Sequence, residues 1–259
     1  MILETIPKME SFSEEHQKTQ VLTVFCDFDG PLVDVSDRYY NTYQIALSNT
    51  REYYQTQSPC LHLKPLSKEQ FWQMKQERLS DQEIALRSGL EIEHIPYFVE
   101  QVRTIVNESF LLKKDKFHQG VNWALALLHS RGVRLVLVTL RCEQQVTQIL
   151  NNYGLLRLFS GVYGTSDDTA AYRNNVECKT ALLKQAVREQ NHRKHCMVGD
   201  TEADILAAKA LGMPTIALTC GVRSCNYLQQ FEPDYIYRDL LTTAHCLLGA
   251  TPPCVQAQA

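Results

Sequence analysis

Short apolar runs alternate with longer amphipathic segments along most of the chain. The runs favour β-branched residues, and they predict strands at residues 21–26, 133–138, 162–164, 196–198, 215–218 and 235–237. Apolar positions at helical spacing predict helices at residues 121–130, 143–153, 179–189 and 202–211. The predicted strands are continuously apolar, as expected for strands buried on both faces of a parallel sheet. This order of elements predicts a doubly wound α/β fold.

The interval from about residue 36 to residue 116 breaks this alternation. It shows no convincing strand, and its helical signals include two capping boxes, which start at Ser67 and Ser80, and Pro96, which is placed to open a helix. We therefore expect an all-helical domain at residues 36–116, inserted into an α/β core of residues 19–35 and 117–250. Residues 1–18 and 251–259 are expected to form flexible tails.

Composition and charge indicate an ordinary globular protein. With 259 residues, of which 44% are hydrophobic, the chain can bury one substantial core. Its net charge of -3 gives no reason to expect nucleic acid or a membrane as a partner, and the basic cluster at residues 113–116 is interpreted as a solvated linker. The amino terminus lacks the features of a secretory signal, so we expect a cytoplasmic protein. The nine cysteines are scattered and form no C-x-x-C pair, which favours reduced thiols.

Acidic residues cluster where the first predicted strand ends. Asp27 and Asp29 are two apart in an extended segment, so both can face the crevice beyond the strand ends while Phe28 faces the core. Crowded carboxylates repel one another unless a cation stabilises them, and Mg²⁺ prefers such oxygen ligands. The cluster therefore predicts a Mg²⁺ site, although a D-x-D-G tetrapeptide alone is often a simple turn.

Further polar residues occur where later strands end. Asp200 and Asp204 follow the strand predicted at 196–198 and can turn toward the same crevice, with helix capping as the alternative explanation for Asp204. Thr139 closes the run at 133–138 and could donate to a phosphate oxygen, although threonine is also a common strand residue. Lys179 opens a helix, where it is either a cation for a bound phosphate or an exposed residue.

Taken in order, these residues resemble the four motifs of the haloacid dehalogenase superfamily of phosphohydrolases and phosphotransferases. The resemblance extends from about residue 21 to residue 226, and it includes the Asp27 run, Thr139, Lys179, and Gly199-Asp200 with Asp204. The later stretch at residues 207–215 is similar to the phosphoglycolate phosphatase group, whose mobile cap the helical insert also resembles.

The resemblance implies a role for each matching position. Asp27 would be the nucleophile and Asp29 the general acid and base of a two-step displacement through an aspartyl phosphate. The implied phosphate-binding residues are Gly30, Thr139, Lys179 and, by its position, Arg141. The implied Mg²⁺ ligands are Asp27, Asp29 through its backbone carbonyl, Asp200 and Asp204. The substrate would be a small phosphate ester, and we expect a monomer or homodimer.

Three positions depart from the family pattern. Gln119 occupies the usual proline position before Gly120 and Val121, a change expected to matter little. Pro31 replaces the usual threonine after Asp-x-Asp-Gly, which predicts a stiffer turn toward the insert. Arg141 ends a Thr-Leu-Arg stretch where Thr-Asn-Lys or Ser-Asn-Gly is more common, and it either adds a phosphate-binding charge or is exposed. Within the insert, Lys75, Arg78 and Arg87 could contact an anionic substrate, but a solvated helix surface is the favoured interpretation for each, since charged residues are mostly exposed.

Three functions remain compatible with the sequence. The leading hypothesis is a magnesium-dependent phosphatase. A phosphomutase of the same superfamily would convert sugar phosphates with little net release of phosphate. A non-catalytic protein that binds a phosphorylated ligand is the third reading, but it has no chemical need for both Asp27 and Asp29.

Overall fold

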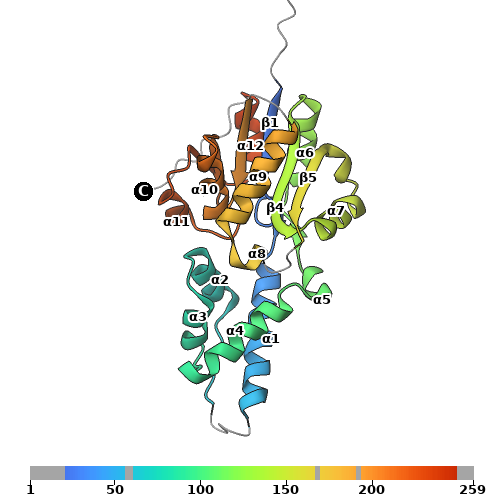
Figure 1. Cartoon of the computed structure of the whole chain (residues 1–259). Helices are drawn as coiled ribbons and strands as arrows, with labels where there is room; N and C mark the ends of the chain where they lie inside the picture. Colours follow the sequence, from blue (N-terminus) through green and yellow to red (C-terminus); the bar gives the residue numbers. More distant parts are fainter. Residues whose placement is uncertain (1–20, 56–60, 167–169, 191–193, 250–259) are drawn as a thin grey trace, which may run out of the picture.

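The computed structural model describes residues 21–55, 61–166, 170–190 and 194–249. Figure 1 shows a strand-containing part with helices around its sheet, and a separate group of helices that lies beyond one end of the strands. The predicted tails at 1–18 and 251–259 lie outside the described residues. None of the described helices is both long and apolar enough to cross a membrane.

Six parallel strands form the sheet, in the order β5-β4-β1-β6-β7-β8. Their bounds are β1 Leu22–Cys26, β4 Arg134–Cys142, β5 Phe159–Thr165, β6 Lys194–Gly199, β7 Thr215–Leu218 and β8 Tyr235–Tyr237. All six predicted strands are present, and the prediction of a doubly wound α/β fold is confirmed. After β1, the chain adds β4 and β5 on one side of it and then β6, β7 and β8 on the other side. This reversal of strand order creates a crevice beyond the carboxyl ends of the strands near β1.

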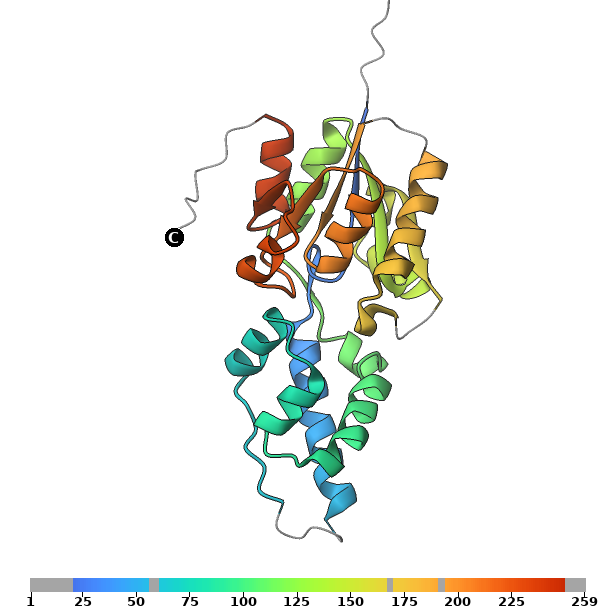
Figure 2. The same cartoon turned by 60° about the vertical axis from the view of Figure 1, so that its left-hand side comes forward.

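Helices cover both faces of the sheet, as the 60° turn between Figure 1 and Figure 2 makes visible. Alternate residues of the strands explain this arrangement: Val24 packs in one cluster with α6, α7 and α12, whereas Phe25 packs in another with α9 and α10. The principal helices are α6 Val121–Ser130, α7 Glu143–Asn152, α9 Val176–Gln190, α10 Glu202–Ala210 and α12 Leu240–Leu247. The shorter elements are η2 Leu156–Leu158, α8 Ala170–Arg173 and α11 Cys225–Gln229.

The segment between β2 Val33–Asp34 and β3 Lys116–Phe117 contains the helical insert, which we define as residues 36–112. Its elements are α1 Ser36–Tyr54, α2 Lys68–Gln76, α3 Asp81–Arg87, η1 Ile92–His94, α4 Ile95–Ile105 and α5 Ser109–Leu112. Both predicted capping boxes are confirmed, at Ser67 with Gln70 and at Ser80 with Glu83, and Pro96 lies in the first turn of α4. Tyr43, Phe71 and Phe98 contribute to a hydrophobic core within the insert.

The chain passes between the sheet and the insert twice, and a two-stranded antiparallel ladder joins these two crossings. It pairs β2 Val33–Asp34 with β3 Lys116–Phe117. Asp34 also accepts a hydrogen bond from the backbone N–H of Ser36 at 2.8 Å, which supports the start of α1. The ladder was not predicted, because two-residue strands leave no periodic signal in the sequence.

The cysteines in the described part of the chain form no disulfide. They are Cys26, Cys142, Cys178, Cys196, Cys220, Cys225 and Cys246. Cys60 and Cys254 lie outside the described residues.

Candidate active site

Three neighbouring strands bring the predicted residues together. β1 lies between β4 and β6 in the sheet, so Asp27 after β1, Thr139 on β4 and Asp200 after β6 reach one edge. The backbone N–H of Asp27 donates to the carbonyl of Val198 at 3.0 Å, which extends the pairing of β1 with β6 into the site. Sheet order therefore explains why residues more than 170 positions apart in the chain are neighbours.

Asp27, Asp200 and Asp204 form the acidic cluster of the site. One carboxylate oxygen from each lies within 4.8 Å of the others, and all three residues are buried. Asp200 Oδ2 accepts from the backbone N–H of Val222 at 2.6 Å, whereas Asp200 Oδ1 has no hydrogen-bond partner among the described residues. Asp204 Oδ2 accepts from the backbone N–H of Thr201 at 3.1 Å and from its hydroxyl at 2.8 Å. The predicted capping role of Asp204 and its place in the cluster are thus compatible.

Lys179 supplies the positive charge of this cluster. Its Nζ lies 2.9 Å from Asp27 Oδ2 and 2.7 Å from Asp204 Oδ1, and the residue is fully buried. It does not open a helix as predicted, because α9 starts at Val176 and Asn175 accepts from the backbone N–H of Cys178 at its beginning. The alternative that Lys179 is exposed is wrong.

One ammonium group does not balance three buried carboxylates. Burial raises the pKa of Asp27 to about 7, with Asp204 adding to the effect and Lys179 opposing it. Burial, Asp204 and Asp27 also raise the pKa of Asp200 well above its usual range. A divalent cation would stabilise the ionised forms, and the unpartnered Asp200 oxygen is a suitable ligand. The cluster could therefore hold a metal ion.

Two glycines make room for Asp200. A Cβ on Gly30 would lie 2.1 Å from Asp200 Cγ, and a Cβ on Gly221 would lie 2.1 Å from Asp200 Oδ2. Gly30 also has a φ of +93°, in the left-handed region that favours glycine. Sequence reasoning selected Gly30 but missed Gly221, because the contact of Gly221 with Asp200 depends on how two loops pack.

Gly30→Ala is expected to destabilise the protein by about 2–4 kcal/mol, because backbone strain at positive φ adds to a clash with the Asp200 carboxylate. Gly132→Ala is the matched control: its φ is +73°, but no atom lies within 4 Å of its added Cβ. Urea unfolding of both variants separates the two contributions. Equal losses of stability would show that Asp200 does not crowd Gly30.

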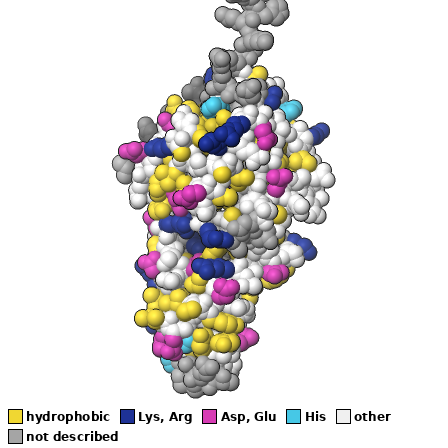
Figure 3. All heavy atoms as spheres, viewed as in Figure 1, with side chains coloured by type: hydrophobic (Ala, Val, Ile, Leu, Met, Phe, Trp, Pro, Cys, Tyr) yellow, Lys and Arg dark blue, Asp and Glu magenta, His cyan; other side chains and the backbone are white. Residues whose placement is uncertain are grey.

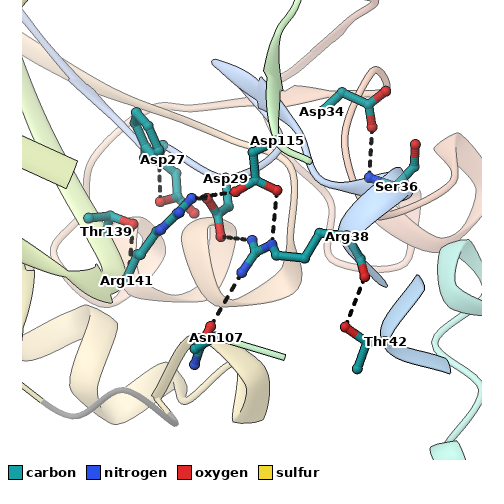
Figure 4. Close-up of polar contacts among 11 residues, drawn as sticks. Asp27, Asp29, Asp34, Ser36, Arg38, Thr42, Asn107, Asp115, Thr139 and Arg141 are labelled. Atoms are coloured by element: carbon teal, nitrogen blue, oxygen red, sulfur yellow. Dashed lines mark hydrogen bonds and ion pairs between the residues drawn. The ribbon is translucent and has the colours of Figure 1, made fainter. Parts of the chain in front are cut away.

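Asp29 lies between two arginines, apart from the acidic cluster. Arg38 Nη2 lies 2.7 Å from Asp29 Oδ2, and Arg141 Nη1 lies 2.9 Å from Asp29 Oδ1 (Figure 4). Burial raises the pKa of Asp29, but the guanidinium groups of Arg141 and Arg38 more than offset this effect and hold the pKa below its usual value. Asp29 is therefore a carboxylate in this arrangement.

Arg38 and Asp115 complete a ring of alternating charges that sequence reasoning missed. Asp115 binds Arg38 Nε at 2.9 Å and Arg141 Nη1 at 2.8 Å. The interpretation of residues 113–116 as a solvated linker is wrong at Asp115, whose side chain is only 6% exposed. Arg38 begins a stripe of buried positions four residues apart on α1, with Thr42, Ala46 and Thr50. Three of these four residues are polar, so hydrophobic periodicity gave no signal for the burial of Arg38.

The structure excludes one of the two alternatives for Arg141 and corrects the predicted placement of Thr139. Arg141 is not exposed, since its side chain is only 2% accessible, and its Nε and Nη2 have no hydrogen-bond partner in the described structure. Thr139 does not end its strand, because β4 continues to Cys142 with an irregular register after Val138. The Thr139 hydroxyl oxygen accepts from the backbone N–H of Arg141 at 3.2 Å, which leaves its own proton available to donate.

The cleft above Asp27 is lined by both parts of the protein. Its volume of about 60 Å³ has room for a few water molecules. Asp27, Asp29, Thr139 and Arg141 line it from the sheet side, and Tyr39, Lys75 and Arg78 line it from the insert. In the view of Figure 3, Lys and Arg side chains gather across the middle of the molecule, where the insert meets the sheet-bearing part. Of the three basic residues predicted in the insert, Arg87 is exposed and does not line this cleft.

Both basic residues of the insert that reach the cleft already have acidic partners. Lys75 Nζ lies 2.8 Å from Asp81 Oδ1, and Arg78 Nε lies 2.8 Å from Glu202 Oε1 at the start of α10. Arg223 also binds Glu202, at 2.9 Å, and donates to the carbonyl of Lys75 at 3.0 Å. These contacts hold the end of α2 against the sheet side of the cleft.

Comparison with known proteins gives one family match. The model of the haloacid dehalogenase-like hydrolase family matches residues 24–218, which include the last three residues of β1 and every site residue described above except Gly221, Val222 and Arg223. The match covers well over half of the chain and spans the helical insert.

Curated relatives match a shorter stretch. The chain is 29% identical over 125 residues to pyrophosphatase PpaX of Halalkalibacterium halodurans, covering 48% of this chain and 56% of the relative. It is 31% identical over 137 residues to phosphoglycolate phosphatase of Vibrio cholerae, covering 52% of this chain and 59% of the relative. The matches thus span little more than half the length of these relatives.

Solved structures share the fold. A haloacid dehalogenase-like family hydrolase from Streptococcus pneumoniae superposes with a TM-score of 0.65 at 20% identity, covering 88% of this chain and 98% of that one. A subfamily IA hydrolase of the same superfamily from Geobacter sulfurreducens gives a TM-score of 0.58 at 18% identity, covering 89% and 97%.

Proposed function

The chain belongs to the haloacid dehalogenase-like hydrolase family, and we propose that it is a Mg²⁺-dependent phosphatase that acts on a small phosphorylated metabolite. The observation that carries the proposal is that two carboxylates at the end of the same strand have different surroundings. Asp27 faces Lys179 and the acidic cluster, whereas Asp29 faces two arginines. Neighbouring acids in different surroundings are suited to different chemical roles.

Asp27 is proposed to be the nucleophile. Its carboxylate oxygen would attack phosphorus, the bond from phosphorus to the ester oxygen would break, and an aspartyl phosphate would form. Water would then attack the same phosphorus and release inorganic phosphate, restoring the Asp27 carboxylate. Splitting the displacement into two steps lowers the barrier of each. Asp27 lines the cleft, where a substrate phosphate can reach it.

Asp29 is proposed to transfer protons in both steps. As a carboxylate held by Arg38 and Arg141, it is in the form required to take a proton from water in the second step. Donating a proton to the leaving oxygen in the first step requires Asp29 to be protonated, which works against both arginines.

Groups around Asp27 are proposed to bind the phosphoryl oxygens. The Thr139 hydroxyl has a proton to donate, and Arg141 Nε and Nη2 are buried donors without partners in the described structure. Lys179 would stabilise negative charge next to Asp27, and Gly30 allows close approach of the backbone. Such preorganised donors contribute most of the catalysis of phosphoryl transfer.

Mg²⁺ is proposed to bind at the acidic cluster. Its ligands would be carboxylate oxygens of Asp27 and Asp200 and the backbone carbonyl of Asp29, with Asp204 in support. When bound, the ion would neutralise charge on the phosphate and the surrounding acids. Asp204 also keeps Lys179 in place, at 2.7 Å.

A cap domain of residues 36–116, which contains the helical insert, is proposed to act on a core of residues 19–35 and 117–250. The contacts of Arg78 with Glu202 and of Arg223 with the backbone carbonyl of Lys75 support this proposal, because they join the two parts beside the cleft. Covering the cleft would exclude bulk water during phosphoryl transfer. The relatives named phosphoglycolate phosphatase and pyrophosphatase support a small phosphate compound as substrate.

The proposal is tested by phosphate release from a panel of phosphate esters and pyrophosphate. We expect turnover with MgCl₂, loss of turnover with excess EDTA, and recovery when Mg²⁺ is restored. Sugar phosphates that are isomerised without phosphate release would instead indicate a phosphomutase. Purified protein that binds phosphorylated ligands but turns over no member of the panel would contradict the proposal.

A further inference from the structure

We propose that Arg38 is a positioning residue that holds the Asp29 carboxylate in place and ties that placement to the orientation of the helical insert. The inference rests on the proposed function, because Asp29 is the proton-transfer group of the proposed reaction. It assigns a role to a residue outside the sequence motifs.

Every nitrogen of the Arg38 guanidinium has a partner. Nη2 binds Asp29 at 2.7 Å, Nε binds Asp115 at 2.9 Å, and Nη1 donates to Asn107 at 3.3 Å. Figure 4 shows the guanidinium between the two carboxylates, with its edge toward Asn107. These contacts use three of the five N–H donors, and Arg38 does not belong to the lining of the cleft that contains Asp27 and Asp29. Arg38 therefore acts through Asp29 and not by binding the phosphate.

Arg141 provides the contrast on the opposite side of Asp29. It shares both carboxylate partners of Arg38 through Nη1, but its Nε and Nη2 have no partner in the described structure. The two arginines and two aspartates are together neutral, so the ring adds no net charge to the cleft. Arg141 can therefore still bind an anion, whereas Arg38 holds Asp29 and Asp115 in place.

The position of Arg38 links the ring to the two chain crossings. Arg38 lies in the first turn of α1, directly after β2, and Asp115 directly precedes β3. Because β2 pairs with β3, any rotation of the insert about these crossings would move Arg38 relative to Asp29, which belongs to the sheet side. Asp29 is therefore held from both sides only when the insert has the orientation described here.

Packing prevents Arg38 from adjusting independently of α1. Its side chain is 2% exposed, and it shares a buried face of α1 with Thr42, Ala46 and Thr50. The Thr42 hydroxyl donates to the backbone carbonyl of Arg38 at 2.8 Å. The guanidinium thus moves with the helix, which is the property required of a positioning residue.

A double-mutant cycle with Asp29 tests the proposal. Arg38→Ala is expected to lower kcat by about 10- to 100-fold with KM nearly unchanged, because a misplaced proton-transfer group slows the chemical step and not binding. In the Asp29→Asn background, the same substitution should change kcat little, since no carboxylate remains to be positioned. Arg38→Lys should show an intermediate loss, because it keeps the charge but cannot bridge Asp29 and Asp115 as a planar fork does.

Controls separate positioning from general damage. Arg51→Ala, an exposed arginine in the last turn of the same helix, should leave kcat unchanged. Circular dichroism verifies folding, and the cycle is run with Arg38→Lys if Arg38→Ala does not fold. If Arg38→Ala lowers kcat by the same factor in the wild type and in Asp29→Asn, the role proposed for Arg38 is wrong, while the proposed phosphatase activity stands. A wild-type protein without turnover would instead contradict the proposed function and the inference that rests on it.

Discussion

Asp27→Asn is expected to lower kcat for phosphate release by about 10⁴-fold or more, a larger loss than at any other position of the site. The amide has nearly the shape of the carboxylate but cannot form the aspartyl phosphate. Asp29→Asn should lose about 10²- to 10³-fold, because it removes proton transfer and leaves the nucleophile in place. Initial rates of phosphate release under saturating Mg²⁺ measure both losses.

The covalent intermediate distinguishes the two variants further. Mass spectrometry of acid-quenched Asp29→Asn should show one added phosphoryl group, because the second step needs a base to activate water. Asp27→Asn should show none. Phosphorylation at another residue, or turnover by Asp27→Asn comparable with the wild type, would assign the nucleophile elsewhere.

Lys179→Met is expected to destabilise the metal-free protein by about 3–5 kcal/mol, since removing one partner leaves buried carboxylates without their cation. Burial lowers the pKa of Lys179, but Asp204 and Asp27 more than offset this effect and raise it, so the ammonium is charged in the folded protein. MgCl₂ should restore more stability to the variant than to the wild type, because the ion replaces the lost positive charge. Urea unfolding with and without MgCl₂ measures both effects.

Lys184→Met is the matched control for this prediction. Lys184 lies on the same helix, α9, but is exposed and has no ion pair among the described residues. It should change the free energy of unfolding by less than about 0.5 kcal/mol in either buffer. If Lys179→Met is equally mild in metal-free buffer, the charge balance proposed for the acidic cluster is wrong.

The strands and the motif residues could be predicted because each depends on local sequence. Apolar runs of strand length show where β1, β4 and β6 lie, and polar residues at or near the ends of such runs reach the crevice of a parallel sheet. Asp27 and Asp200 were found in this way, and the structure brings them within reach of one ion. The start of α9 was misplaced by three residues, because the Asn175 cap was not recognised.

Residues without a local signal were missed. Asp115 follows two lysines in a short polar segment, and only its packing against Arg38 and Arg141 makes it a buried ion-pair partner. Gly221 is far from the motifs in sequence, and its need for a small side chain is set by contact with Asp200. Arg141 was selected from the sequence, but its burial was left open, because it depends on compensation of its charge by Asp29 and Asp115.

The sequence by itself determined the α/β fold, the helical insert and the acids that follow its strands, because hydrophobic periodicity and strand-end polarity are properties of short segments. Tertiary structure alone decided which charges neutralise one another. Asp27 is paired with Lys179, and Asp29 is paired with Arg38 and Arg141, although the two acids are separated by one residue. The physical reason is distance: electrostatic interactions depend on separation in space, and packing of the insert on the sheet sets that separation.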